Sequence, residues 1–343
     1  MFPWSRDLSG RLDECLIESD LLQGNPLGDP HVRPLWVYTP PGYDDSDGDY
    51  PAIYVLQGYL GQVDMWRNRL PFQQTFVETA DELIEKGSVP PVVLAFVDAW
   101  TSYGGSQFLD SPGTGRYHSY LCDEIVPWID RNYRTLSRRE SRGIVGKSSG
   151  GFGAMVTPML RPDLFSALAT HAGDSLFEYT CFSKFPLCLR QLRAYDGDIQ
   201  RWWDEFRARL PVMRPGEISL LILLGMSACF SADVDGTPQI PFDTRSGILR
   251  PDVWERWLRL DPVRMVSRHV EAVRSLHSIW IDGGTADEQF MDVGAQAFRA
   301  ALARAGVPDD VVRFELFPGG HGGLDHRYPL SLEWLARRLI PAA

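Results

Sequence analysis

The chain has 343 residues, of which 44% are hydrophobic, so it can bury a large core and is not expected to be disordered. Its formal net charge of −11 at pH 7 argues against nucleic acid or an anionic membrane surface as the main partner. The longest apolar run, residues 218–230, is too short to span a bilayer, and no basic stretch followed by a long apolar run opens the chain. Five scattered cysteines favour reduced, buried thiols over a disulfide framework or a zinc site. These features predict a cytoplasmic protein.

Short β-rich runs alternate with helical stretches, which is typical of a mostly parallel sheet with helices on both faces. The first run, residues 13–19, is expected at an antiparallel edge. Helices are expected at residues 72–87 and 286–306, where Gly306 marks the end of the second. Seven further strands are expected at residues 33–39, 51–57, 91–98, 141–146, 166–173, 276–282 and 311–317. The predicted fold class is therefore α/β with an eight-stranded sheet.

The segment from residue 175 to 275 departs from this alternation. It contains helix-like runs at residues 190–211 and 250–266. The apolar run at residues 218–230 is compatible with a buried strand or a buried helix, and its length and the Pro-Gly pair before it favour a helix. We expect a single domain spanning residues 1–343, in which residues 175–275 form a cap over the carboxyl edge of the sheet, where open α/β sheets bind ligands.

The sequence G-K-S-S-G at residues 146–150 follows an expected strand and precedes a helix-like run. It fits the G-x-S-x-G pattern in the strand–turn–helix setting of a nucleophile elbow, where small residues flank a serine on a strained turn. Such a turn exposes the hydroxyl of Ser148 at a helix N-terminus, whose dipole favours developing negative charge. A phosphate-binding loop fits less well, because neither the P-loop nor the Rossmann glycine spacing is present. A solvated turn without function is the remaining alternative.

A serine hydroxyl needs a positioned base to become a good nucleophile, and the chain has seven histidines. His321 lies in the glycine-rich sequence FPGGHGG directly after the last expected strand, so its ring can reach over the sheet edge. His326, a few residues further on, is the close competitor. The other histidines have no comparable setting and are expected to be packing or surface residues.

The acid that orients this histidine is expected in the glycine-rich turn after the strand at residues 276–282. Asp287 is the first candidate, and a helix N-cap is its non-catalytic alternative. Asp282 and Glu288 are the second and third candidates. The order of serine, acid and histidine along the chain is that of an α/β-hydrolase.

A carbonyl attacked by serine becomes an oxyanion, and two backbone N–H groups usually stabilise it. Ser149, directly after the expected nucleophile, is predicted to supply the first. Tyr59 is predicted to supply the second from the loop after the strand at residues 51–57, where Gly58 permits the turn.

With these residues identified, the chain resembles the putative-esterase family of α/β-hydrolases. This family includes S-formylglutathione hydrolases, feruloyl and acetylxylan esterases, enterobactin-type esterases and mycolyltransferases. The resemblance runs from Trp36 to Leu339, and it is carried by five ordered stretches at residues 35–61, 111–136, 142–173, 281–290 and 317–323.

The resemblance implies an α/β-hydrolase fold with Ser148 as nucleophile, Asp287 as acid and His321 as base. It also implies that the amides of Tyr59 and Ser149 form the oxyanion hole. Two departures concern side chains: Gln-Gly stands where the family often has His-Gly, and serine rather than methionine follows the nucleophile. Because backbone amides act at both places, the resemblance still implies activity, with a pocket of different polarity and shape.

Aromatic residues are numerous around the expected cleft. Trp66, Trp100 and Tyr103 follow sheet strands and are predicted to contact the substrate, although aromatic residues could equally join the cap to the core. Five more aromatic residues lie in the cap, namely Trp202, Trp203, Phe242, Trp254 and Trp257.

The aspartates at positions 233 and 235 suggest a calcium site, because Asp233 and Asp235 are close together in a polar sequence. This sequence lacks the glutamate of an EF-hand loop, so it is better interpreted as a polar turn.

Together these observations predict a serine esterase that hydrolyses a small-molecule carboxylic ester through an acyl-enzyme, without metal or cofactor. Acyl transfer to an alcohol would use the same residues, and an inactive binding protein of the same fold is the alternative from another functional class. Neither nucleic acid nor membrane is expected as a partner, and the sequence leaves a homodimer open.

Overall fold

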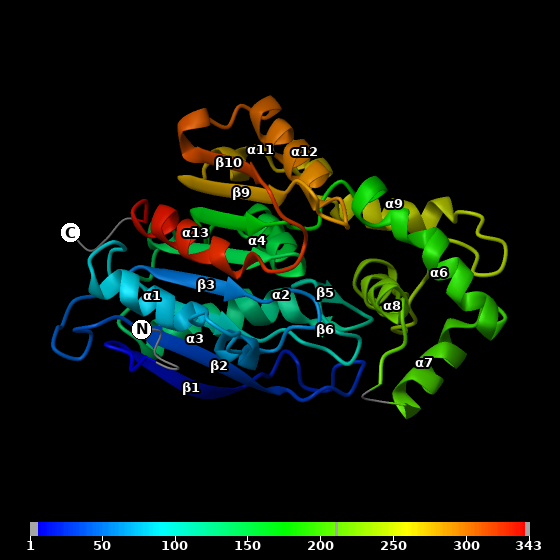
Figure 1. The fold of residues 1–343 in the computed structure, drawn as a ribbon, viewed down its shortest axis with the longest axis horizontal. Helices are drawn as coiled ribbons and strands as arrows, with labels where there is room; N and C mark the ends of the chain where they lie inside the picture. Colours follow the sequence, from blue (N-terminus) through cyan, green and yellow to red (C-terminus); the bar gives the residue numbers. More distant parts are fainter. Residues whose placement is uncertain (1–5, 210–211, 340–343) are drawn as a thin grey trace.

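The computed structural model describes residues 6–209 and 212–339. The strands of the main sheet are β1 Arg11–Glu18, β2 Val32–Thr39, β3 Ala52–Leu56, β4 Val93–Val97, β7 Arg142–Lys147, β8 Ala167–His171, β9 Ser278–Gly284 and β10 Val312–Phe317. They lie in the order β1-β2-β4-β3-β7-β8-β9-β10 (Figure 1). β2 is antiparallel to both of its neighbours, and all other adjacent strands are parallel. The eight predicted strands and the antiparallel edge at β1 are confirmed.

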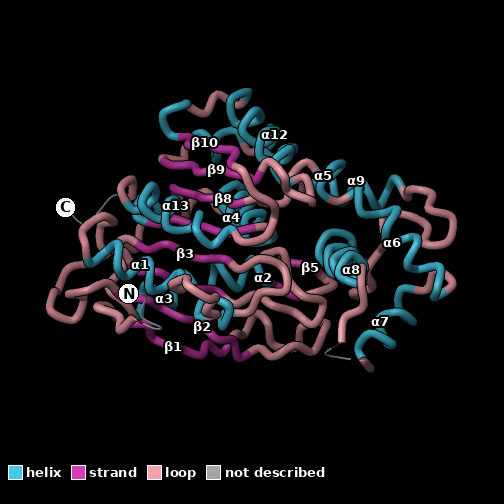
Figure 2. Tube along the Cα trace, viewed as in Figure 1, coloured by secondary structure: helices cyan, strands magenta, loops and turns pink. Residues whose placement is uncertain are grey.

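Helices cover both faces of this sheet (Figures 1 and 2). One face is covered by α1 Phe76–Glu85 and α13 Arg327–Ala336. The other is covered by α3 Val126–Asn132, α4 Ser149–Leu160 and α12 Met291–Arg304. A separate two-stranded sheet of β5 Asp110–Ser111 and β6 Gly115–Arg116 lies outside the main sheet and was not predicted.

Alternate residues of β3 face these two helix layers. Ile53 and Val55 share a core with α1 and α13, whereas Tyr54 and Leu56 share a core with α3 and α4. Because both faces are covered, all five residues of β3 are apolar and buried. This continuous burial fixes the end of the strand, and with it the position of the loop that carries Tyr59.

Helix α1 begins later than the predicted start at residue 72. The Thr75 side chain accepts a hydrogen bond from the Glu78 N–H, and the Glu78 carboxylate accepts one from the Thr75 N–H at 2.8 Å. This capping box starts the helix at Phe76 and leaves the preceding residues outside it. At the other predicted helix, Gly306 adopts a φ of 81° and ends α12 as expected.

Among the described residues between β8 and β9 there are seven α-helices and no strand of the main sheet. The apolar run at residues 218–230 lies within a helix, so the preference for helix over strand is confirmed. No helix in residues 6–209 or 212–339 is long and apolar enough to cross a membrane. The seven are α5 Phe177–Thr180, α6 Phe185–Leu192, α7 Ile199–Ala208, α8 Glu217–Ser231, α9 Pro251–Leu260, α10 Pro262–Met265 and α11 Val270–Arg274.

We refer to α6, α7, α8 and α9 as the cap helices, because they lie beyond the carboxyl ends of the parallel strands (Figure 1). That the chain is one domain with a cap inserted at residues 175–275 stays a prediction.

The predicted helix-like run at residues 190–211 is divided into two helices, α6 and α7. Asp196 and Gly197 between them both have positive φ, at 55° and 79°, which ends a right-handed helix. Asp198 then caps α7 with a side-chain hydrogen bond to a backbone N–H. The run at residues 250–266 is likewise divided, into α9 and α10, where a proline follows an aspartate. The last two residues of the first run lie outside the described residues.

Candidate active site

Ser148 stands at the turn between β7 and α4. Its φ of 55° and ψ of −122° are a combination that few residues with a side chain adopt. A Cβ on Gly146 would lie 2.3 Å from the carbonyl carbon of Gly150, and a Cβ on Gly150 would lie 2.4 Å from the carbonyl oxygen of Leu56. The backbone N–H of Ser148 donates to the carbonyl of His171 at 2.9 Å, which ties the turn to β8. The flanking glycines are therefore required by the close approach of the backbones.

Replacing Gly146 with alanine is expected to lower the free energy of unfolding by about 3 kcal/mol, because the new methyl group meets backbone atoms that cannot rotate away. Gly58→Ala is the matched control, since its Cβ would meet the Lys147 carbonyl oxygen at an ordinary 3.4 Å and should cost less than about 1 kcal/mol. Urea denaturation of both variants checks this difference, and equal losses of stability would contradict it.

Three side chains from three loops meet at the elbow. The Oγ of Ser148 lies 3.0 Å from Nε2 of His321, and Nδ1 of the same ring lies 2.9 Å from Oδ2 of Asp287. Asp287 also accepts a hydrogen bond from the N–H of Gln289 at 2.8 Å, so the carboxylate holds its own turn as well as the imidazole. The three residues predicted as nucleophile, base and acid are thus brought into one hydrogen-bonded line, which suits proton transfer from a serine hydroxyl.

The other candidates for acid and base lie in different settings. Glu288 accepts a hydrogen bond from the backbone N–H of His321 at 3.0 Å, so it holds the histidine loop and does not contact the ring. His326 is exposed, and its Nδ1 contacts the carbonyl of Gly323 at the start of α13. Asp282 is fully buried and binds three other side chains, those of His171, Trp280 and Arg327.

The loop that carries Tyr59 lies directly beside the nucleophile. A Cβ on Gly58 would be 3.7 Å from Cβ of Ser148. The Tyr59 hydroxyl lies 2.7 Å from the carbonyl oxygen of Leu221 in α8 and also contacts the carbonyl oxygen of Tyr103. The side chain therefore anchors this loop to a cap helix, which fixes the backbone from which the Tyr59 amide projects.

Ser149 opens α4 and is held by a residue that no sequence motif indicated. Its hydroxyl accepts a hydrogen bond from Nε2 of Gln107 at 3.0 Å. Gln107 is buried and has a φ of 53°, a backbone conformation that costs energy and is often retained at functional sites. The residue is 42 positions away from Ser149 in the sequence, so only the fold reveals the contact.

The aromatic residues predicted to contact the substrate differ in their surroundings. Trp66 is 3% exposed and packs in the core with other aromatic rings, including Tyr328 at a centroid distance of 5.2 Å. This packing leaves its ring little surface for a substrate, so it fits the core alternative. Trp100 and Tyr103 are half-buried, and the Tyr103 ring lies edge-on to Trp203 of α7 at 5.1 Å. Tyr103 thus joins the sheet side of the site to the cap.

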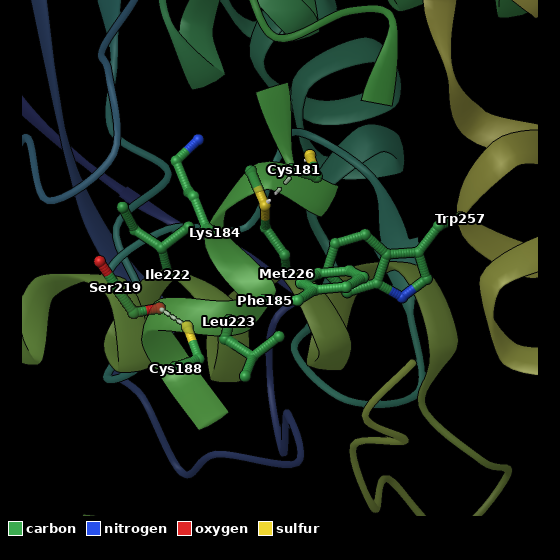
Figure 3. Close-up of a pocket in the computed structure, with 9 residues that line it drawn as sticks. All are labelled: Cys181, Lys184, Phe185, Cys188, Ser219, Ile222, Leu223, Met226 and Trp257. Atoms are coloured by element: carbon green, nitrogen blue, oxygen red, sulfur yellow. Dashed lines mark hydrogen bonds between the residues drawn. The ribbon is translucent and has the colours of Figure 1, made fainter. Parts of the chain in front are cut away.

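A small pocket lies between α6 and α8 (Figure 3), with a cavity volume of about 10 Å³, which is room for about one water molecule. Burial raises the pKa of the Cys181 and Cys188 thiols to about 12, so both stay neutral and add to an apolar wall. Trp257 also lines it, together with Phe185, Ile222, Leu223 and Met226. The other cap aromatic residues that the sequence singled out are buried in the core, namely Trp202, Trp203, Phe242 and Trp254.

The aspartates considered for calcium have protein partners. Asp233 pairs with Arg256 at 3.0 Å, and Asp235 accepts the N–H of Thr237 at 3.0 Å, as in a polar turn. Across residues 6–209 and 212–339, no group of three or more His, Cys, Asp or Glu side chains is placed to hold a metal ion.

The family model described as "Putative esterase" matches residues 30–328, which include the elbow and the loops of Asp287 and His321. The chain belongs to this esterase family. "Esterase Rv1288" of Mycobacterium tuberculosis is 23% identical over 312 residues, which are 90% of this chain and 56% of that protein. "Uncharacterized protein YbbA" of Bacillus subtilis is 28% identical over 151 residues, 43% of this chain and 58% of the relative. The chain thus spans just over half the length of these curated relatives.

Solved structures of esterases share the fold of this family member. A ferulic acid esterase superposes with a TM-score of 0.63 at 19% identity, covering 97% of this chain and 100% of the other. An S-formylglutathione hydrolase from Agrobacterium tumefaciens superposes with a TM-score of 0.58 at 16% identity, covering 98% of each chain. These likenesses confirm the predicted α/β-hydrolase fold.

Proposed function

We propose that the protein is a serine hydrolase that cleaves a small-molecule carboxylic ester through an acyl-enzyme. The observation that carries the proposal is the hydrogen-bonded line from Ser148 through His321 to Asp287 at a strained elbow. In the first half-reaction Oγ of Ser148 attacks the carbonyl carbon while Nε2 of His321 takes the hydroxyl proton. Asp287 accepts the hydrogen bond from Nδ1 and stabilises the imidazolium that forms.

The amides of Tyr59 and Ser149 would hold the oxyanion of the tetrahedral intermediate. When that intermediate collapses, the bond to the leaving alcohol breaks and His321 returns the proton to the alcohol oxygen. A water molecule then repeats the attack on the acyl-enzyme with His321 as its base, and release of the acid restores Ser148. None of these steps needs a metal or a cofactor.

Acyl transfer is the second candidate within the same chemistry, because an alcohol could replace water in the second half-reaction. An inactive binding protein is disfavoured by the complete set of three side chains at hydrogen-bonding distances. A cytoplasmic location and a homodimer stay predictions from the sequence.

A fluorophosphonate probe tests the proposed nucleophile, because it reacts covalently with an activated serine. We expect the wild-type protein to be labelled at Ser148, as located by peptide mass spectrometry. Ser148→Ala should lose the label, and the matched variant Ser149→Ala should keep it at Ser148. Absence of labelling in folded wild-type protein would contradict the proposal and favour a binding protein.

A further inference from the structure

Asp174 is a nearly buried carboxylate close to the candidate site: a Cβ on Gly151 of α4 would lie 2.8 Å from Cα of the preceding Gly173, and the Asp174 charge interacts with His321. Asp174 follows β8 by three residues, and β8 is the strand to which the Ser148 turn is hydrogen-bonded. The residue is only 2% exposed to solvent. Among the residues that the structure describes, none donates a hydrogen bond to its carboxylate.

This lack of donors sets Asp174 apart from the other buried carboxylates of the described chain, each of which accepts at least one hydrogen bond. Asp261 is the nearest comparison, since it is also buried and accepts the N–H groups of Leu176 and Phe177, both at 3.0 Å. The oxygens of Asp174 are not among the fully enclosed unpaired side-chain atoms of the described chain, so they keep a small contact with solvent through which a ligand group could reach them. A carboxylate that is almost dehydrated and lacks donors is costly, and such groups are concentrated at sites that bind or transform a ligand.

The loop that holds Asp174 is fixed on both sides. The N–H of Ala172 donates to the carbonyl of Asp282 at 2.9 Å, and the Ser175 hydroxyl donates to the carbonyl of Gly173 at 3.3 Å. A Cβ on Gly294 of α12 would lie 2.6 Å from the Ser175 carbonyl oxygen, so the loop packs tightly on that helix. A rigid loop of this kind presents its carboxylate in one place, which favours recognition of a ligand group.

The strand order separates the Asp174 loop from the Tyr59 loop. Along the sheet edge the loops follow the order β3, β7, β8, β9, β10, so Tyr59 and Asp174 lie on opposite sides of Ser148. The carbonyl oxygen of a bound ester would face the amides of Tyr59 and Ser149. The alcohol oxygen would then face Nε2 of His321, on the side of β8 and Asp174.

We propose that Asp174 is a specificity-determining residue that accepts a hydrogen bond from a hydroxyl group on the alcohol part of the substrate. The proposal rests on the function proposed above and names a feature of its substrate. A neutral hydroxyl fits better than an ammonium group, because the positive charges of Lys184 and Lys147 already act on this carboxylate. Burial raises the pKa of Asp174, and those lysines and His321 oppose the rise, so an added donor would help to keep the group ionised.

The test compares matched esters that differ only by a hydroxyl in place of a methyl group. On the alcohol side these are 2-hydroxyethyl acetate and propyl acetate, and on the acyl side ethyl 3-hydroxypropanoate and ethyl butyrate. In the wild type we expect kcat/KM to favour 2-hydroxyethyl acetate. In Asp174→Ala, the kcat/KM for 2-hydroxyethyl acetate divided by that for propyl acetate should fall roughly 10- to 100-fold, which is the range for losing a hydrogen bond to a charged acceptor. In Asp174→Asn the same ratio should fall less. Both esters of a pair are measured on the same preparation, so a partly unfolded variant leaves the ratio intact.

Asp325→Asn is the matched control, because it removes an exposed carboxylate whose charge also interacts with Lys147, next to the nucleophile. This variant should leave the alcohol-side kcat/KM ratio as in the wild type. A ratio that both Asp174 variants leave unchanged would overturn the role of Asp174 without affecting the proposed function. A change confined to the acyl-side pair, or a stronger Asp174-dependent preference for 2-(dimethylamino)ethyl acetate, would overturn the assignment to an alcohol-side hydroxyl. Wild-type protein that hydrolyses none of these esters and resists the fluorophosphonate would overturn both proposals.

Discussion

Replacing Asp287 with asparagine is expected to lower kcat for ester hydrolysis by about 10⁴-fold with little change in the free energy of unfolding. The asparagine amide can still accept the N–H of Gln289, so the local turn should survive. Its NH₂ group can, however, donate to Nδ1 of His321, which then carries its proton on Nε2 and cannot take one from Ser148. Steady-state kinetics on an activated ester, together with urea denaturation, measure the two effects separately.

Glu288→Gln is the control for this variant, because it removes the neighbouring negative charge and retains an oxygen that can accept the N–H of His321. We expect it to lower kcat less than about tenfold, since it acts on the loop and not on the ring. If Asp287→Asn retained more than a tenth of the wild-type kcat, the carboxylate would not have the proposed role.

The central parts of the fold and site were predictable because their signals are local. Strand β3 is apolar throughout because it is covered on both faces, and the elbow needs glycines at residues 146 and 150 because backbones pass within contact distance. His321 could be preferred over His326 because glycines flank it directly after a strand. Each of these inferences depends on neighbouring residues, which a single sequence displays.

Other parts depend on contacts between distant segments and could not be read from the chain. Gln107 holds Ser149 across 42 positions, and Asp174 is unusual only because the fold brings it no donor. The residues around Trp66 in the sequence are compatible with a position in the cleft. Its burial becomes apparent only from its contact with Tyr328 of α13, at the opposite end of the chain. The division between α6 and α7 is a different case. The Asp-Gly-Asp sequence at residues 196–198 causes it, and that signal is local, although the surrounding pattern predicts one continuous helix-like run.

The structure contains a second line of serine, histidine and aspartate, and its burial indicates a structural role. Nδ1 of His171 lies 2.9 Å from Asp282, and Nε2 lies 2.9 Å from the hydroxyl of Ser331 in α13. All three residues are fully buried, so no substrate could reach them. Trp280 and Arg327 also donate to Asp282, at 2.7 and 2.9 Å. This network joins β8 and β9 to the helix that follows the His321 loop.

Replacing Asp282 with asparagine is therefore expected to lower the free energy of unfolding by about 3 kcal/mol at neutral pH, because it leaves Arg327 and its neighbours without a buried anion. Glu315→Gln is the matched control: it removes the partly exposed second partner of Arg327 and should cost less than about 1 kcal/mol. Urea denaturation of both variants measures the two losses, and similar values would contradict the proposed role of the buried network.

The same substitution is expected to change how stability depends on pH. Burial alone would raise the pKa of Asp282, but His171, Trp280 and Arg327 outweigh it and hold the pKa below its ordinary value. When folding lowers the pKa of a carboxylate, the ionised group makes its full contribution to the stability of the folded protein at any pH above its unfolded pKa of about 3.9. That contribution to stability is lost as the pH falls through the lower pKa of the folded state. The stability gap between wild type and Asp282→Asn should therefore narrow as the pH falls below about 4. A difference in stability that stayed constant with pH would show that Asp282 acts through its shape alone. A difference that narrows would show that the His171–Asp282 pair stabilises the fold through its charge. If Asp287→Asn also loses turnover and keeps its stability, the His321–Asp287 pair serves the chemistry instead.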